Sequence, residues 1–376
     1  MWAPGRAPAR SRLSKAVTPS TSPDLIGHTG QVQTSGIVWA IYWGPQWGTQ
    51  PFTGDKETGI TSLLQGIGGS NYQNIWSEYY TAGIPPTYIT NQTTYEGSFT
   101  DHSTPPSGDL YGQFGVVGTE VCNVLSANHV TPSPNDVYLV YSTTPSDNIC
   151  GWHNSGSCGS TKIFFAYILD MDNSQCATKV PIVAGHSVGL SGLANATAHE
   201  LSEAITDPAV LVAWSDPQEL EMADLCQFEW RGPNHSTTLS NGAVFALQDL
   251  WSNNANDQGY GYADVDNLGG HGCVPPAPWT HVVTWITSGN NPSQATIMNY
   301  CTWTANAAGG TAPYTYAWQA IGTNLFDTPN GASVTVYKFD SGSYQLQLTV
   351  KDAKGQLATI SRPVYMTSFG TGDCIP

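Results

Sequence analysis

The segment Asn195–Pro208, which reads NATAHELSEAITDP, decides how the rest of this chain is interpreted. At 100° per residue on a helix, His199 and Glu203 lie one turn apart on one face, with Glu200 beside them. The opposite face carries an apolar stripe of Ala194, Ala198, Leu201 and Ile205. The segment therefore predicts an amphipathic helix whose polar face is either solvated or a metal-binding surface.

The same segment contains signals for both ends of this helix. Asn195 is of the residue type preferred at N-caps, where its side chain accepts a bond from a free backbone N–H. Asp207 precedes Pro208, and proline removes a backbone donor and disfavours helical geometry in the residue before it. The helix is therefore expected to begin at Asn195 and to end at Asp207.

A second acidic block, AWSDPQELEMADLC, follows the predicted helix. Glu221 comes 22 residues after His199, close to the roughly 20-residue separation at which a second helix supplies a carboxylate to a zinc site. Asp224, one turn further, is placed to accept the spare N–H of His199 and so to fix its tautomer. The predicted ligands are therefore His199, Glu203 and Glu221, with Glu200 as the general base and Asp224 supporting His199.

The sequence predicts the ligands of the site more narrowly than the identity of the metal. Zinc is the expected ion because the pattern is close to His-Glu-x-x-His, but Glu203 stands where a second histidine is usual. Two carboxylates and one imidazole make a harder and more negative site. Calcium and manganese therefore remain alternatives to zinc.

The composition favours a globular, acidic chain and excludes some partners. The 376 residues are 40% hydrophobic and only 11% charged, with a formal net charge of −16. Four of the twelve basic residues lie in the first fifteen positions, so the remaining body is more acidic still. Such a body repels phosphate backbones and anionic lipids, and no stretch approaches the roughly 18 apolar residues of a membrane span. We expect neither a nucleic-acid nor a membrane partner.

Cysteine usage and glycosylation sequons indicate a secreted protein. The eight cysteines are an even set without a Cys-x-x-Cys pair, which favours disulfides over a zinc knuckle. Sequons begin at Asn91, Asn195 and Asn234. The N-terminus is basic but lacks the apolar run of about 7–15 residues that a signal peptide needs. Residues 1–26 are therefore predicted to be a disordered leader or the remnant of a pro-segment.

Residues 27–276 are predicted to form an α/β (α+β) catalytic domain, because helical and strand patterns interleave along them. The predicted strands are 37–43, 87–90, 136–141, 162–169 and an edge strand at 179–183. The predicted helices, apart from the one described above, are 60–67, 72–80 and 110–128.

Residues 277–376 differ in texture, with alternating apolar and polar runs separated by glycine and asparagine turns, and predict a small β-sandwich. The run GGTAPYTYAW at 309–318, with GSY at 342–344 and LTVKD at 348–352, resembles the polycystic-kidney-disease-type (PKD) immunoglobulin-like domain. The resemblance implies a spacer or binding module attached to a secreted hydrolase, with possible contact to polysaccharide or cell wall. Cys301 and Cys374 lie near its two ends and could close it with a disulfide.

The larger part also resembles a known family over roughly residues 28–275. The motifs HELSEAITDP, AWSD, EMADLC and QDLWSN, with GIVWAIYWG, VYLV and CGWH upstream, are similar in type and order to the phosphate-induced, EXORDIUM-like secreted family. The resemblance implies a secreted, wall- or medium-associated protein with a zincin-like helix. This chain has Leu220 and Ala223 where the family usually has glycine, so local backbone geometry is expected to differ there.

Together these features predict a secreted zinc-dependent metallopeptidase that acts on protein or peptide substrates, with Glu200 accepting the proton of the attacking water. His153, Tyr260 and Tyr262 are candidate donors to the transition state, although His153 could instead only pack. A non-catalytic, wall-associated binding protein with a degenerate metal site is the first alternative.

A serine hydrolase is the second alternative. The sequence GHSVG at 185–189 has the form of a nucleophile elbow around Ser187, and an expected strand precedes it. Asp264 with His271 or His281 would complete a triad. The downstream carboxylates would then have no role, and Ser187 could equally be an ordinary turn residue.

Overall fold

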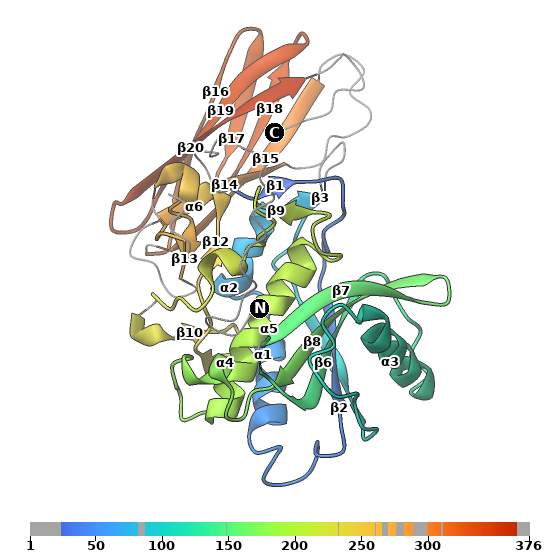
Figure 1. Ribbon diagram of the computed structural model, residues 1–376. Coiled ribbons are helices and arrows are strands. Elements are labelled where there is room, and N and C mark those ends of the chain that lie inside the picture. The colour runs from blue at the N-terminus through green and yellow to red at the C-terminus, as the bar shows by residue number, and fades with distance from the viewer. Residues whose placement is uncertain are drawn as a thin grey trace.

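The computed structural model describes residues 24–81, 87–147, 149–231, 233–259, 261–264, 270–275, 282–288, 299–309 and 311–366. Most of the segment predicted as a leader lies outside these residues. Its last positions are ordered, since Leu25 is buried and strand β1 (Ile26–Gly27) pairs with β9 (Trp214–Ser215). The described chain is a mixed α/β structure rich in sheet (Figure 1).

A five-stranded mixed sheet is the framework of the first part. Its strands, in spatial order, are β5 (Thr94–Asp101), β2 (Ile37–Trp43), β6 (Asp136–Pro145), β8 (Thr161–Asp170) and β7 (Gly151–Cys158). All neighbouring pairs are parallel except β7 and β8, which are antiparallel. The outer edge of β7 pairs with no other strand of the described chain.

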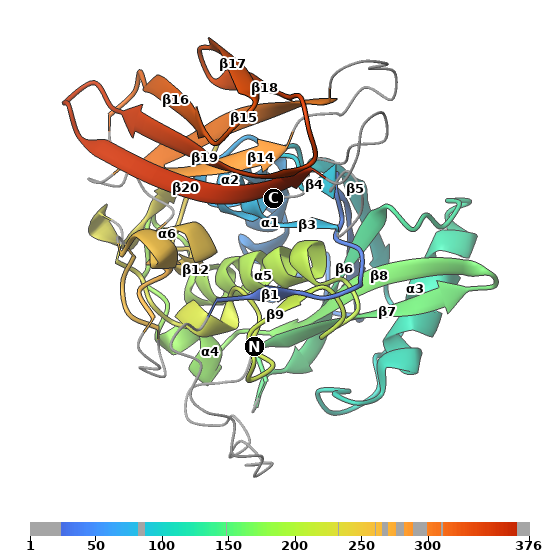
Figure 2. The same cartoon turned by 90° about the horizontal axis from the view of Figure 1, so that it is seen from above.

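Both faces of this sheet are covered, which explains the near-continuous apolar runs of its central strands. On β6, Val137, Leu139 and Tyr141 face one hydrophobic cluster, and Tyr138 and Val140 face another. Helix α3 (Phe114–Ala127) covers the second face, whereas α5 (Val188–Thr206) and α1 (Lys56–Ile67) lie on the first (Figures 1 and 2).

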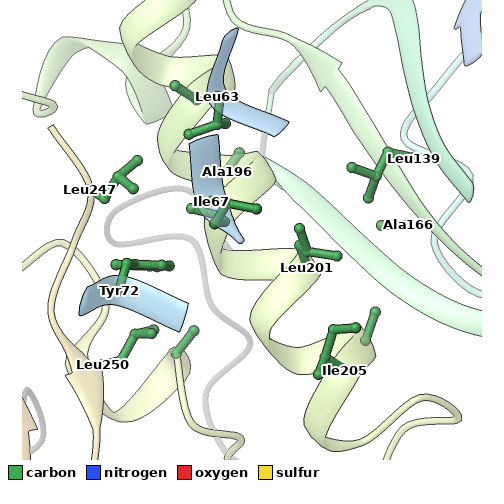
Figure 3. Close-up of a cluster of buried hydrophobic side chains, with 14 of the residues drawn as sticks. Leu63, Ile67, Tyr72, Leu139, Ala166, Ala196, Leu201, Ile205, Leu247 and Leu250 are labelled. Carbon is green, nitrogen blue, oxygen red and sulfur yellow. The ribbon is translucent and has the colours of Figure 1, made fainter. Parts of the chain in front are cut away.

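Helix α5 is buried over its whole length from Gly189 to Thr206. Leu201 points toward Leu139 and Ala166 of the sheet, and Ala196 lies near Leu63 and Ile67 of α1 (Figure 3). A solvated acidic face is therefore excluded for this helix. Its polar residues must be satisfied inside the protein.

The N-terminus of α5 differs from the prediction. The helix begins at Val188, with Ser187 as its N-cap, and the Ser187 hydroxyl accepts a bond from the Leu190 N–H at 3.0 Å. The predicted cap, Asn195, lies inside the helix and pairs with Gln248 through bonds of 2.9 and 3.4 Å. Because Asn195 is 1% exposed, its sequon is closed to glycosylation in the folded chain. The C-cap is Asp207, as expected.

Other predicted elements in this part are largely confirmed. The structure has α2 (Asn71–Asn74) and the short helix η1 (Ile75–Glu78) in place of one helix at 72–80, and β4 (Thr87–Tyr88) pairs with β3 (Tyr80–Thr81). The edge strand predicted at 179–183 is wrong, because these residues follow α4 (Gln175–Thr178) without strand structure. Strands β5 and β7 were not predicted, since their polar and glycine-rich sequences lack a strong strand pattern.

Short elements complete the first part. They are η2 (Asp224–Cys226), η3 (Pro233–His235), β10 (Thr237–Thr238), β11 (Val244–Phe245), β12 (Leu250–Trp251), α6 (Asn253–Gln258) and β13 (Cys273–Val274). β10 pairs with β11 and β12 pairs with β13.

The C-terminal part consists of two antiparallel sheets. Its strands are β14 (Val282–Ser288), β15 (Asn299–Gly309), β16 (Thr315–Ile321), β17 (Leu325–Asn330), β18 (Ser333–Lys338), β19 (Gly342–Lys351) and β20 (Leu357–Met366). One sheet has the order β14-β15-β18-β17 and the other β16-β19-β20. Residues of both sheets, such as Trp303, Val336 and Leu348, share one hydrophobic cluster. The part is therefore two-layered and β-rich, with a core of its own.

Three disulfides join Cys122 to Cys158, Cys150 to Cys176, and Cys226 to Cys273. Stable disulfides of this kind are typical of extracellular proteins. The predicted bond between Cys301 and Cys374 cannot be placed, because Cys374 lies outside the described residues. None of the described helices has the length and apolar character needed to cross a bilayer.

Candidate metal centre

Helix α5 supplies three neighbouring functional side chains near its C-terminal end. His199 and Glu200 are fully buried and Glu203 is 2% exposed. The 3.6-residue period places His199 and Glu203 on one face, as predicted. The Nε2 atom of His199 lies 3.0 Å from Oε1 of Glu203.

The chain turns back after α5 and brings further carboxylates to the same place. The Asp207 side chain stabilises this turn by accepting bonds from Val212 N–H and Ala213 N–H at 3.0 and 2.7 Å. The disulfide between Cys226 and Cys273 then ties η2 to β13. The carboxylates before and within η2 are therefore held next to α5.

Asp224 is the acidic residue that meets His199. Its Oδ1 atom lies 3.4 Å from Nε2 of His199, and its side chain is 26% exposed. His199, Glu203 and Asp224 each offer one ligand atom, and these three atoms lie within 4.8 Å of one another. The cluster is most open to solvent at Asp224.

His153, on the edge strand β7, lies among the other acidic side chains. Its Nδ1 atom is 3.4 Å from Oε2 of Glu200 and 3.6 Å from Oε2 of Glu203. Its Nε2 atom is 3.3 Å from Oε1 of Glu221 and 3.0 Å from the backbone oxygen of Asp207. His153 is thus part of the cluster rather than only a packing residue. With Glu200 and Glu203 it forms a second group that can hold an ion.

The structure gives Glu221 a different neighbour from the one predicted, whereas Asp224 lies beside His199 as expected. Asp224, expected to support a ligand, lies with His199 and Glu203, whereas Glu221, expected to be a ligand, lies against His153. The prediction assumed one continuous helix over this block. In the structure only the three-residue η2 is helical, and it starts at Asp224, so Glu221 projects from non-helical chain.

The charges of this cluster do not balance. If all four carboxylates of Glu200, Glu203, Glu221 and Asp224 were ionised, the cluster would carry a net charge of about −2 even with His153 and His199 both protonated. Burial of charge at this level is unfavourable unless a cation compensates it.

The pKa values follow the same electrostatics. Burial by itself lowers the pKa of His199, but the carboxylates of Glu203 and Asp224 outweigh burial and raise this pKa to about 10. Burial also lowers the pKa of His153, but Glu221 and Glu200 outweigh burial and raise this pKa well above the usual value. Burial raises the pKa of Glu221. Without a cation, bound protons reduce the repulsion between the carboxylates. A metal ion that binds the imidazoles would displace the protons on them.

Several buried polar atoms in this cluster have no hydrogen-bond partner. They are Nδ1 and Nε2 of His199, Oε1 of Glu203 and Oε1 of Glu221. Oε1 of Glu203 therefore approaches His199 without hydrogen-bond geometry. Ligand atoms that share one tetrahedral ion at about 2.0–2.2 Å lie roughly 3.3–3.6 Å apart, close to the separations found around His199. The residues present therefore fit a divalent cation.

Of the two predicted tyrosine donors, the structure describes Tyr262. Tyr260 lies outside the described residues. Tyr262 is 44% exposed, pairs with Cys273 in an isolated β-bridge, and lies under Arg231, whose guanidinium carbon is 5.2 Å from the ring centroid. We assign no role in the site to Tyr262.

Ser187 has the geometry of a helix cap rather than of a nucleophile. Its hydroxyl donates to Oδ1 of Asp55 at 2.5 Å and accepts from Leu190 N–H. The strand required before an elbow is not formed. Of the proposed partners, His281 lies outside the described residues, and the backbone N–H groups of Asp264 and His271 bond to Gly270 and Asn256. The serine-hydrolase interpretation has no support in this geometry.

Comparison with known proteins gives few matches. No protein-family model matches the chain, and neither does any curated protein sequence. Among solved structures, wild-type OgpA from Akkermansia muciniphila aligns over 93% of this chain and 98% of its own, at 10% identity and a TM-score of 0.24. Catalytically inactive OgpA in complex with an O-glycopeptide substrate gives 10% identity, 93% and 97% coverage and a TM-score of 0.23. A lipoprotein from Bacteroides thetaiotaomicron covers 21% of this chain and 77% of its own, at 11% identity and a TM-score of 0.16. Scores of this size do not establish a shared fold.

Proposed function

We propose that this protein is a secreted, metal-dependent peptidase of zincin type, related to the phosphate-induced, EXORDIUM-like family. The observation that carries the proposal is the buried cluster of two histidines and four carboxylates, in which atoms of His199, Glu203 and Glu221 lack hydrogen-bond partners. Hydrolytic metal sites need this combination of protein ligands and a nearby carboxylate base.

His199, Glu203 and Asp224 are the ligands we assign. Their ligand atoms are mutually close, and Asp224 is the most exposed of the three side chains. An ion bound there supplies Lewis acidity, which polarises a carbonyl group and lowers the pKa of water. Zinc is the ion we favour, with manganese or calcium as alternatives, because two carboxylates make the site hard.

Glu200 is the proposed general base. It lies next to His199 in the chain and is turned toward His153, whose Nδ1 atom is 3.4 Å from its Oε2 atom. A carboxylate that stays unprotonated can accept the proton of an attacking water. His153 would then orient Glu200, since its Nδ1 atom faces Glu200 while its Nε2 atom faces Glu221 and the Asp207 carbonyl.

The edge strand β7 offers a place for the peptide. His153 lies on this strand, and no other strand of the described chain pairs with its outer edge. An extended peptide that adds to such an edge gains backbone hydrogen bonds. The more exposed part of this edge, from Asn154 to Cys158, directly follows His153.

The C-terminal sheets are proposed to form a PKD-like module that associates the enzyme with polysaccharide or cell wall. Their separate hydrophobic cluster supports this assignment. Three disulfides support secretion.

Elemental analysis and a casein digestion scan between pH 3 and 8 test the proposal with Glu200→Gln. We expect stoichiometric metal in both proteins and a loss of activity of about a thousandfold in the variant. Glu96→Gln, at an exposed position on β5, is the matched control and should behave as wild type. Absence of metal together with full activity of Glu200→Gln would falsify the proposal. Bound metal without cleavage of any protein substrate would favour the binding-protein alternative.

A further inference from the structure

Three aromatic rings form a row across the outer face of the sheet β14-β15-β18-β17. Tyr300 lies opposite Tyr337 on the neighbouring strand, and Tyr337 lies opposite Phe326 on the next. The ring centroids are 5.5 Å apart for Tyr300 and Tyr337 and 6.1 Å apart for Tyr337 and Phe326. Phe326 is 57% exposed, and the two tyrosines are half-buried. This arrangement, the aromatic row, has no part in the core.

A row of hydroxyl groups runs beside the aromatic row. Thr302, Thr335 and Thr328 occupy the same three strands, each two residues from the aromatic residue of its strand, and therefore share the same face. Thr302 and Thr335 are linked by a bond of 3.0 Å between their Oγ1 atoms, and the Thr328 hydroxyl donates to the Thr335 carbonyl. An apolar strip thus lies next to a strip of polar donors and acceptors.

This face carries no charge along the described strands. The positions that alternate with the buried ones on β15, β18 and β17 are Tyr, Thr, Ser, Asn, Ala and Phe. The chain as a whole has a net charge of −16. The partner of this face is therefore uncharged, because an anion would be repelled and a cation would find no carboxylate on it.

A chain of sugar rings matches these features. Each ring presents flat C–H faces that pack on aromatic rings and equatorial hydroxyls that bond to groups at the side. Three adjacent strands span about 10 Å, which is enough for consecutive sugars of an extended chain. The aromatic planes are inclined by 34° and 40° to one another, so the three ring faces do not lie in one plane. A twisted row fits a single chain better than a flat crystal surface.

The place of the row in the molecule leaves it accessible. The first part contacts this region through β14 and β20, for example between α6 and both strands. Strands β17 and β18 lie on the side away from α5 (Figure 2). We propose that the aromatic row Tyr300–Tyr337–Phe326 binds single chains of an uncharged, extended polysaccharide, independently of the metal centre.

Affinity electrophoresis of the full chain in gels containing hydroxyethyl cellulose tests this proposal. We expect retardation of the wild type, and about fivefold weaker binding for Phe326→Ala and for Tyr337→Ala, which each remove one stacking ring. Tyr337→Phe keeps its ring and should bind within about twofold of wild type. Leu357→Ala is the matched control, because Leu357 is equally exposed at 57% but lies on β20 of the other sheet.

Further measurements separate the sources of any effect. His199→Ala should bind the polymer normally, so failure of the peptidase proposal leaves this one intact. Polygalacturonate, which is anionic, should not retard the protein, and microcrystalline cellulose should bind less than the soluble polymer. The proposal is overturned if the wild type is not retarded, or if Leu357→Ala loses as much polymer binding as the ring variants. It is also overturned if the anionic polymer binds equally well or the crystalline polymer binds more strongly. Self-association of the protein at this face without polymer binding would overturn it as well.

Discussion

Oε1 of Glu221 lies 3.3 Å from Nε2 of His153, so a carboxylate that follows α5 orients an imidazole on the edge strand β7. The other ring nitrogen of His153 faces Glu200 at 3.4 Å. His153 therefore bridges the proposed base and Glu221, while Asp224 accompanies His199. Two acidic residues only three positions apart serve different histidines.

This division predicts different outcomes for two conservative variants. Asp224→Asn removes a proposed ligand and should weaken metal binding by more than about 100-fold, measured by titration against a chelator. Glu221→Gln should keep the metal within about threefold but lower kcat by about 10- to 100-fold, because His153 loses its orienting partner. The reverse pattern, with metal lost only in Glu221→Gln, would restore the ligand set expected from the sequence and contradict the geometry.

The pairing of acidic residues with histidines could be predicted from the sequence only in part. The His199–Glu203 relationship was predictable because a helical period alone determines it. The partner of Glu221 was not predictable, because the chain between α5 and η2 has no regular secondary structure whose period would tell which way the side chain points. His153 was named only as a candidate donor, since its strand β7 has a polar, glycine-rich sequence and no strand pattern.

Gly151 predicts a further sensitivity of the site. A Cβ at this position would lie 3.1 Å from Cγ and Oε1 of Glu200 and 3.1 Å from the Tyr167 carbonyl, so an alanine must push Glu200 aside. We expect Gly151→Ala to lower kcat/KM by roughly 10- to 100-fold while metal content is retained. Peptidase assays with elemental analysis measure both quantities.

Gly156 on the same strand provides the control. A Cβ there would lie 3.1 Å from Cε1 of Phe165, on the face covered by α3 and away from the acidic cluster. Gly156→Ala should therefore retain near wild-type activity even if it costs some stability. Equal loss of activity in both variants would mean that β7 is sensitive as a strand, and the specific contact with Glu200 would not be the cause.

The fold was more predictable than the site, because its central elements leave regular patterns in the sequence. Central strands such as β2 and β6 are buried on both faces, and this leaves continuous apolar runs in the sequence. Helix α5 was recognised only in its second half, because its first half carries Gly189 and Gly192, which lower helix propensity. Gly192 is required by packing, since a Cβ there would lie 2.6 Å from the Cβ of Ala177.

Asp249 predicts how stability changes with pH. Its side chain is fully buried, and burial raises its pKa to about 7, against the opposing effect of the backbone N–H and charge of Arg231. Because the folded pKa lies above the usual value near 3.9, the folded state prefers the protonated acid. This contribution to stability is fully present below about pH 4 and is lost as the pH rises through about 7.

Asp249→Asn keeps a neutral side chain of the same shape, so it should match wild type at pH 4 and exceed its unfolding free energy by about 2–4 kcal/mol at pH 8. Urea denaturation at both pH values measures this difference, and Asp147→Asn, at an exposed position, should show no such gain. A variant that is less stable than wild type at pH 8 would show instead that the ion pair between Asp249 and Arg231 outweighs the burial of the carboxylate.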